Sequence, residues 1–509
     1  MAEQNHFSQD HSHRTLSGQD AESGIAKQPH HSVGFWHPRM SKVRAHVIRS
    51  WAQTGFIVLI LVCFIMAVLA LYWAVLFHVE DNMRALTVQV VDFDGQAPYN
   101  NIEPFVGPMV TQLAQQTVDM EGPSLGYIVL PPSDFNNDPI AVRQAVYDFH
   151  SYAAIIVNAN ATALLMDAVA NGNTTYDPTG AIQMILLSSR DETTYYNYIL
   201  PEFQTFTKMF MSQFGTMWIQ RLANNASVTK EMLAAAPNAV NPGVSFLQLD
   251  LRPFQPPTAT PSVTIGLIYL IIMAFFSFSF FVPIHQKYIT PQGHPPLHFW
   301  QFIIWRWVAT VVSYVLISLA YSLVSLAFLI PFWPPPASPT EVAMSTTAYG
   351  RGTFPVYWMI NFVGMMALGL ASENVTMIVG QPWTALWLIF WVISNVSTAF
   401  YSIDLAPGFF KWGYAWPLHN IVEASRSTLF DLHSRIGLNF GVLFAWVAIN
   451  TALFPLCCFF MRWKTENDKR KAEKEKDRFV VNTEDGEREY KKEKGTKPPI
   501  RKRGFMRGM

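Results

Sequence analysis

The strongest constraint on this chain is a set of apolar segments that are each long enough to cross a lipid bilayer. They cover residues 55–77, 263–283, 303–331, 356–379, 384–402 and 441–461. The first would form a helix about 35 Å long, which exceeds the roughly 30 Å thickness of the hydrocarbon core. Charged residues make up only 14% of the chain, whereas about 25% is usual in soluble proteins. The sequence therefore predicts a polytopic α-helical membrane protein with about six transmembrane helices, five of them in a membrane domain over 263–461.

Between the first two spans lies a polar region, residues 78–262, that is long enough to fold as a domain. The cysteines Cys63, Cys457 and Cys458 all lie inside apolar runs, so this region must fold without a disulfide framework. Short β-branched runs alternate with helical patterns along it. The expected strands are 86–92, 125–130, 153–157 and 182–187, and the expected helices are 103–117, 139–149, 160–170 and 194–222. This alternation predicts an α/β domain with a partly parallel sheet.

The placement of charge predicts how the chain is oriented in the membrane. Basic residues precede the first span with no acid among them, and residues 462–509 carry 17 Lys or Arg against ten Asp or Glu. Basic flanks remain in the cytoplasm. Both ends are therefore predicted to be cytoplasmic, residues 1–54 as a disordered tail with a basic flank and 462–509 as a charged tail. The α/β domain then lies outside the cytoplasm, where its N-x-S/T sequons are candidate glycosylation sites at Asn160, Asn173 and Asn225.

Motifs for common enzyme chemistry are missing from the sequence. It contains no Walker A loop, no dinucleotide-binding glycine motif, no hydrolase elbow and no zinc-protease motif. We therefore predict no enzymatic activity, no catalytic or metal site and no cofactor, and the formal net charge of zero gives no indication of nucleic-acid binding. The first 37 residues hold six histidines, for which a polar tail is favoured over loose metal binding because no ordered ligand spacing is present.

A few polar residues within the apolar runs are candidates for an intramembrane site. Glu373, Asn361 and Asn374 fall in the fourth run, and carboxylates in such places often mark proton or substrate paths. The alternative for Glu373 is a protonated carboxyl that hydrogen-bonds a neighbouring helix. Arg306 lies between two tryptophans and is interpreted as an interfacial anchor, with a contact to lipid phosphate or to an ATPase partner as the alternative.

The segment before the last span has the pattern of an amphipathic helix. Over residues 418–433, apolar residues alternate at helical spacing with a charged face that includes His419, Glu423, Arg426 and Asp431. This pattern predicts a helix on the outer membrane surface. Its role is either structural or part of an outward gate.

The order of the segments resembles a known group of membrane proteins. One span, a large outside domain and five further spans are similar to ABC-2-type permeases of the Pip/YhgE-like branch. The strand and turn Val90–Gly95 after the first span, and the segment Trp416–Arg426 before the last, look like their counterparts in that branch. Over about 45–465 the chain resembles more closely the fungal nitrosoguanidine-resistance family, which shares a domain of unknown function.

This resemblance implies a fungal membrane protein involved in resistance to toxic compounds. The first functional hypothesis is export or transbilayer movement of amphipathic compounds or lipids, by a homodimer or with a separate ATPase subunit. The alternative is a non-transporting regulator or scaffold that binds a ligand or partner through its outside domain. The expected partner in both cases is the lipid bilayer, and the expected location is the plasma membrane, with a secretory-pathway membrane as the alternative.

Overall fold

The computed structural model describes residues 34–287, 295, 297–380 and 382–495. The chain divides into two compact units, residues 1–63 and 64–509. In the first unit a helix begins at Ser41, so the basic flank within 41–54 is helical and not part of a disordered tail as predicted. The reason is local, because no Pro or Gly interrupts the sequence between Ser41 and Gly55. Residues 1–33, with five of the six tail histidines, lie outside the described residues.

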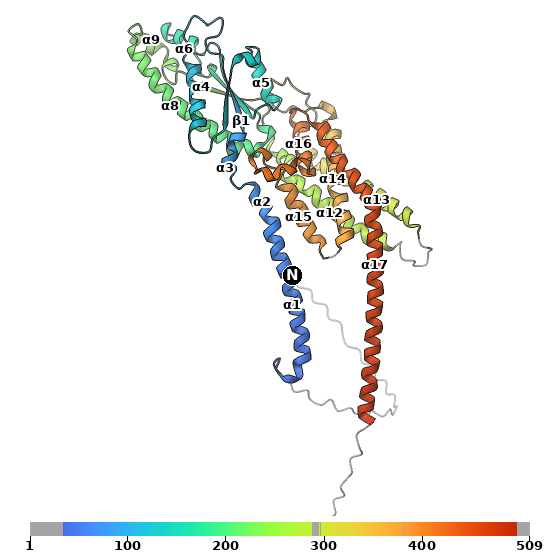
Figure 1. Ribbon diagram of the computed structural model, residues 1–509. Helices are drawn as coiled ribbons and strands as arrows, with labels where there is room; N and C mark the ends of the chain where they lie inside the picture. Colours follow the sequence, from blue (N-terminus) through green and yellow to red (C-terminus); the bar gives the residue numbers. More distant parts are fainter. Residues whose placement is uncertain (1–33, 288–294, 296, 381, 496–509) are drawn as a thin grey trace, which may run out of the picture. The chain divides into compact units, whose positions relative to one another are not determined.

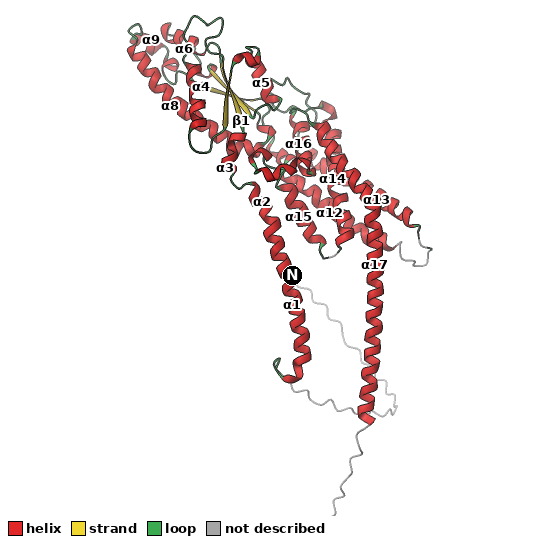
Figure 2. Ribbon diagram, in the orientation of Figure 1, coloured by secondary structure: helices red, strands yellow, loops and turns green. Residues whose placement is uncertain are grey.

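Most of the described chain is helical (Figure 2). The α-helices are α1 Ser41–Phe64, α2 Ala70–Val75, α3 Val79–Asn82, α4 Val106–Asp119, α5 Pro139–Tyr147, α6 Ala161–Ala170, α7 Glu192–Thr194, α8 Leu200–Asn224, α9 Lys230–Ala235, α10 Pro237–Val240, α11 Thr260–Val263, α12 Ile268–Lys287, α13 Phe299–Ala327, α14 Thr353–Val379, α15 Thr384–Val396, α16 Pro417–Phe430 and α17 Ile436–Gly495. The strands are β1 Thr87–Asp92, β2 Gly126–Leu130, β3 Ala153–Val157, β4 Ile182–Leu186 and β5 Phe246–Asp250.

The strands form one mixed sheet in the order β2-β1-β3-β4-β5. The pairs β1–β2, β1–β3 and β4–β5 are parallel, and β3–β4 is antiparallel. Four strands lie within one residue of their predicted positions, because each is a short β-branched or aliphatic run bounded by turn residues. The fifth strand, Phe246–Asp250, was not predicted, and its half-exposed residues give it a weak apolar pattern.

The two faces of the sheet are covered differently. One face packs on helices α4, α6 and α8, where Phe206, Phe210 and Trp218 are buried among the aliphatic side chains of β1, β3 and β4. The other face packs on α5 and also on residues from the membrane segments, including Tyr357 of α14 and Phe430 at the end of α16. Figure 1 shows α4, α6 and α8 together on one side of the sheet and α5 on the opposite side. The α/β domain therefore shares part of its core with the membrane helices.

Within the part of the chain that the structure describes, five helical segments are long and apolar enough to cross a membrane: Ser41–Val75, Pro257–Phe276, Phe299–Ala327, Gly350–Val379 and Ile436–Lys474. Helix α14 is the central one and is buried along most of its length, since it contacts α12, α13, α16 and α17. Two glycines allow this packing. A Cβ atom at Gly364 would collide with Ile421, and one at Gly369 would collide with Tyr314.

The predicted span at 384–402 is shorter than expected. Helix α15 has 13 residues, or roughly 20 Å of helix, and it ends at Val396. Beyond it the hydroxyl groups of Ser397 and Thr398 hydrogen-bond back to the carbonyl of Ser394, which competes with continuation of the helix. The segment begins near the end of α14, and Asp404 beyond it contacts Tyr152 of the α/β domain. A sixth crossing stays a prediction.

Candidate functional site

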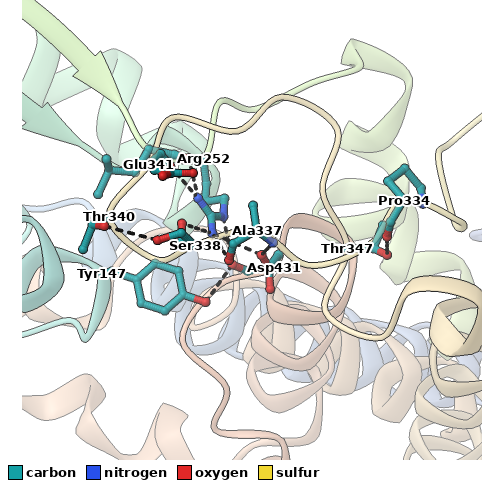
Figure 3. Close-up of polar contacts among 10 residues, drawn as sticks. Tyr147, Arg252, Pro334, Ala337, Ser338, Thr340, Glu341, Thr347 and Asp431 are labelled. Carbon is teal, nitrogen blue, oxygen red and sulfur yellow. Dashed lines mark hydrogen bonds and ion pairs between the residues drawn. The ribbon is translucent and has the colours of Figure 1, made fainter.

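One buried arginine joins the α/β domain to the membrane segments (Figure 3). Arg252 follows strand β5 and is 1% exposed. Its Nε donates to the carbonyl oxygen of Asp431 at 3.1 Å, and its Nη2 donates to Asp431 Oδ2 at 3.1 Å. The same carboxylate oxygen accepts from the backbone N–H of Ala337 at 2.9 Å, and Arg252 also donates to the carbonyl of Glu341 at 3.0 Å. The end of β5, the loop after α13 and the end of α16 are therefore fixed to one another.

Helix α16, which was predicted on the outer membrane surface with a charged face, is enclosed by other parts of the protein. The helix is present over Pro417–Phe430, but every residue except Glu423 is buried. Its charged side face contacts the α/β domain, where Arg426 Nη2 lies 3.5 Å from Asp191 Oδ1. Within the helix, Glu423 pairs with His419 at 3.3 Å and not with Arg426. The amphipathic pattern could not distinguish a helix facing water from one whose polar face meets another domain.

A cavity of about 120 Å³ lies between α16, the loop before it and the α/β domain. We call it the junction cavity. Six of its lining residues carry a formal charge at neutral pH: Arg190, Asp191, Asp404, Glu423, Arg426 and Arg435. His419 and His433 also line it, as do several aromatic side chains. Among the four predicted residues of this region, His419, Glu423 and Arg426 reach the cavity, whereas Asp431 belongs to the contact with Arg252.

Burial and charge modify the titration of groups around the junction cavity. Burial lowers the pKa of Arg190 from its usual value. Burial and the nearby Asp404 carboxylate raise the pKa of Tyr414 to about 12. Burial raises the pKa of Glu423, but the hydrogen bond and charge of His419 and the two nearby arginines outweigh it, so that the net pKa is lowered. The carboxyl of Glu423 is thus ionised at neutral pH and the Tyr414 hydroxyl keeps its proton.

A line of buried polar side chains runs along helix α13, and we call it the polar seam. Its members recur at every third or fourth position: Arg306, Thr310, Tyr314, Ser318, Ser322 and Ser325. From the first to the last, the helix rises roughly 29 Å, close to the thickness of the hydrocarbon core. An uninterrupted polar face of this length is unusual on a helix of this hydropathy, because neighbouring lipid offers no hydrogen-bond partners.

Side chains of other helices pair with the polar seam along its length. At one end the Ser325 hydroxyl lies 2.8 Å from that of Ser262 and 3.1 Å from that of Tyr357. Further along, the amide of Asn361 donates to Ser322 at 3.0 Å. Asn374 lies apart from the seam, and its amide donates to the carbonyl oxygen of Asn450 in α17 at 2.9 Å.

The other end of the seam holds an ion pair. Arg306 Nε donates to Glu373 Oε1 at 2.8 Å, Nη2 lies 2.7 Å from the same oxygen, and the Thr310 hydroxyl donates to Oε2 at 3.3 Å. Both charged side chains are 1% exposed. The interpretation of Arg306 as an interfacial anchor is therefore wrong, because its flanking tryptophans give no information about the face to which the arginine points. The structure brings two predicted residues together that lie 67 positions apart in the sequence.

The sequons differ in accessibility. Asn173 and Asn225 are exposed in turns, where each side-chain oxygen accepts a hydrogen bond from the residue two positions later. Asn160 is half-buried, and Thr162 of its sequon is buried with its hydroxyl bonded to Asp94. Among the described residues, no group of three or more His, Cys, Asp or Glu side chains is placed to hold a metal ion.

Comparison with protein families gives one match over most of the chain. Residues 57–452 match the model of a family described as proteins of unknown function, DUF3533. The chain belongs to this family. The match includes the α/β domain, the polar seam and the junction cavity.

The DUF3533 chain is also similar to an uncharacterized endoplasmic reticulum membrane protein of Saccharomyces cerevisiae. The two are 26% identical over 468 residues, which cover 87% of this chain and 86% of the yeast protein. No solved structure matches the chain. These findings support an integral membrane protein of a family whose function is not defined.

Several site residues of this DUF3533 protein were missed by the sequence analysis. The polar residues of α13 beyond Arg306 could have been found from the sequence, since they recur at intervals of three and four residues, which places them on one face of a helix. Arg190 and Arg252 carry no such signal, because each lies just beyond a strand and resembles an ordinary surface residue of a soluble domain. The importance of Arg252 depends on its contact with Asp431, 179 positions away, and that of Arg190 on a cavity whose other lining residues extend to Asn439.

Proposed function

We propose that this protein moves amphipathic compounds or lipids out of, or across, the bilayer and so confers resistance to toxic chemicals. The observation that carries the proposal is the polar seam with its buried Arg306–Glu373 pair. Ionisable residues inside membrane segments are costly and commonly mark the path of a substrate or proton. A cargo with a polar head would exchange its hydration for contacts along such a seam while its apolar part stays in lipid.

The ion pair is suited to act as the element that changes during transport. A buried pair is weak evidence for stability, because desolvation of both charges offsets much of their attraction. A pair that breaks and forms again can bias two arrangements of α13 and α14. The resemblance to ABC-2-type permeases supports the same proposal, with a homodimer or a separate ATPase subunit as the source of energy coupling.

A second candidate is a regulator or scaffold that does not transport. The Arg252–Asp431 contact favours it, because this contact fixes the α/β domain to the membrane helices and would transmit ligand or partner binding to them. In that case the seam holds the helices together through interhelical hydrogen bonds, which are worth about 0.6 kcal/mol each in membrane proteins.

The experiment that separates the two candidates is the loss of a fluorescent amphipathic dye from cells with and without the chain, before and after ATP depletion. We expect faster loss in expressing cells, and we expect Glu373→Gln to abolish the difference at equal protein level. The matched control is Ser313→Ala on the same helix but outside the polar seam. Equal dye kinetics despite a persisting difference in resistance would reject transport and favour the regulator.

We propose further that both termini are cytoplasmic and that the α/β domain faces the lumen or the cell exterior. Sensitivity of the protein to endoglycosidase, lost on replacement of Asn173 and Asn225 by Gln, is the expected result. Cysteines introduced at these two positions give a second readout. If the chain is not glycosylated and these cysteines react only with reagents on the cytoplasmic side, the proposed orientation is wrong. The plasma membrane is the proposed location, and the similarity to a yeast endoplasmic reticulum membrane protein favours the alternative, a secretory-pathway membrane.

A further inference from the structure

We infer that the junction cavity is a binding site for a phosphate-type oxyanion, held by the guanidinium groups of Arg426, Arg190 and Arg435. This assignment concerns binding and does not require transport. Only the use of the site as the first contact for the head group of a cargo rests on the proposed function.

The acidic groups of the cavity are already occupied by neighbours. Asp191 accepts from the backbone N–H and the hydroxyl of Thr194 at 3.2 and 2.7 Å. Asp404 accepts from the hydroxyls of Tyr152 and Tyr414 at 2.7 and 3.1 Å. Glu423 lies 3.3 Å from His419 Nε2. Although acids and arginines are equal in number, Asp191 and Asp404 therefore have donors of their own, and Glu423 faces the His419 ring.

The arginines, in contrast, have donors left over. Arg426 is 6% exposed, yet its Nε and Nη2 atoms have no hydrogen-bond partner, and the nearest carboxylate oxygen lies at 3.5 Å. The guanidinium of Arg190 makes one hydrogen bond to a described residue, to the carbonyl of Ser151 at 2.8 Å. That of Arg435 makes none within the described part of the chain and lies over the ring of Phe149.

Buried donors without acceptors carry a free-energy penalty that an incoming acceptor removes. Arginine donors are arranged in a planar fork that matches the oxygen atoms of a phosphate or carboxylate. Two aromatic rings hold the guanidinium of Arg190 in place. Its carbon lies 3.8 Å from the centre of the Tyr152 ring and 4.4 Å from that of the Phe149 ring. A rigid guanidinium loses little entropy when it binds an anion.

The cavity is large enough for a small oxyanion. Its volume of about 120 Å³, taken as the space open to the centres of water-sized spheres, is several times the roughly 10–15 Å³ that one water molecule needs on the same measure. A phosphate group can enter it, either as the free ion or as the end of a larger amphiphile whose remainder lies outside the cavity. Both sources present the same oxygen atoms to the arginines, so that the test must distinguish them.

The test is isothermal titration calorimetry on the full chain purified in a non-ionic detergent. Sodium phosphate is one probe, and dihexanoyl phosphatidylglycerol below its micellar concentration is the other. We expect Arg426→Gln and Arg435→Gln each to weaken binding on the order of tenfold. Arg221→Gln is the control, since Arg221 is an exposed arginine on α8 of the α/β domain, outside the cavity lining.

Binding of phosphate, weakened by either cavity variant, supports a free-ion site. Binding of the lipid probe alone, weakened in the same way, supports the head group of an amphiphile. If neither probe binds, or if Arg435→Gln binds as the unmodified chain does, the assignment is rejected. Arg435 is exposed, so its variant decides even if Arg426→Gln does not fold. A failure of dye export with anion binding intact would reject the transport proposal and leave this assignment standing.

Discussion

The buried pair of Arg306 and Glu373 allows a quantitative prediction. Glu373→Gln keeps the shape of the side chain but leaves Arg306, which is 1% exposed, without a countercharge. Removal of one partner of a buried pair costs about 3–5 kcal/mol, because a charge remains in a low-dielectric environment. For domains of about 150–250 residues each kcal/mol shifts the midpoint of thermal unfolding by roughly 2–4 °C, and less for larger chains, so the midpoint should fall by several degrees and at most on the order of 10 °C.

The measurement is thermal unfolding of a fluorescent fusion, followed by size-exclusion chromatography in detergent. The control is Glu466→Gln, which breaks the Arg462–Glu466 pair on α17, where both side chains are about half exposed and their nitrogen and oxygen lie 3.1 Å apart. An exposed pair of this kind is worth less than about 1 kcal/mol, so this variant should unfold almost as the unmodified chain does.

A double variant tests the reasoning itself. Arg306→Met combined with Glu373→Leu removes both charges and fills the space with apolar groups, which for buried pairs is often neutral or stabilising. We expect it to recover most of the lost unfolding temperature while abolishing dye export. If the double variant unfolds as early as Glu373→Gln, or if Glu373→Gln is no worse than Glu466→Gln, the cost does not come from an uncompensated charge and the argument fails.

Three further predictions concern the α/β domain and its attachment. Arg252→Met should lower the unfolding midpoint of the full chain by an amount similar to Glu373→Gln, because Asp431 loses its partner. The same variant should be cleaved faster after β5 in limited proteolysis, and an unchanged cleavage rate would contradict this role of Arg252. Gly107→Ala should reduce the yield of folded protein, since a Cβ atom there collides with the Asp92 carboxylate, and normal yield would show that the helix can shift. Burial raises the pKa of Asp92 to about 6 and that of Glu192 to about 7, from ordinary values of 3.8 and 4.5. The stability that these retained protons contribute is fully present below about pH 4 and is completely lost once the pH has risen through the raised pKa values of about 6 and 7. The unfolding midpoint should therefore fall between about pH 4 and pH 7, and a slope that Asp92→Asn leaves unchanged would assign the effect to other groups.

Local patterns were sufficient for most elements of the fold. Strand β3 was predicted with its observed bounds because five consecutive aliphatic residues between polar turns leave few alternatives. The long spans were predicted because bilayer thickness imposes a minimum length that apolar composition reveals directly. The segment at 384–402 was the exception, since hydroxyl groups after Val396 end the helix in a way that mean hydropathy does not register.

The candidate sites were accessible from the sequence only in part. The sequence identified Arg306 and Glu373 as unusual because an ionisable residue in an apolar run is costly wherever it lies. It could not show that the two meet, because contact between α13 and α14 depends on which faces the helices present to each other. The same holds for α16, whose charged face was predicted to meet water and in fact meets Asp191 and the rest of the α/β domain.

From the sequence alone it follows that this chain enters a membrane, that residues between the first two spans form an α/β domain, and where most helices and strands lie. These properties follow from composition and periodicity, which act over ten to twenty neighbouring residues. The tertiary structure alone decided that Arg252 holds Asp431, that Arg306 holds Glu373, and that three arginines surround one cavity. Such pairings join residues many helical turns apart, and only the packing of whole helices and sheets brings their charges within a few ångströms.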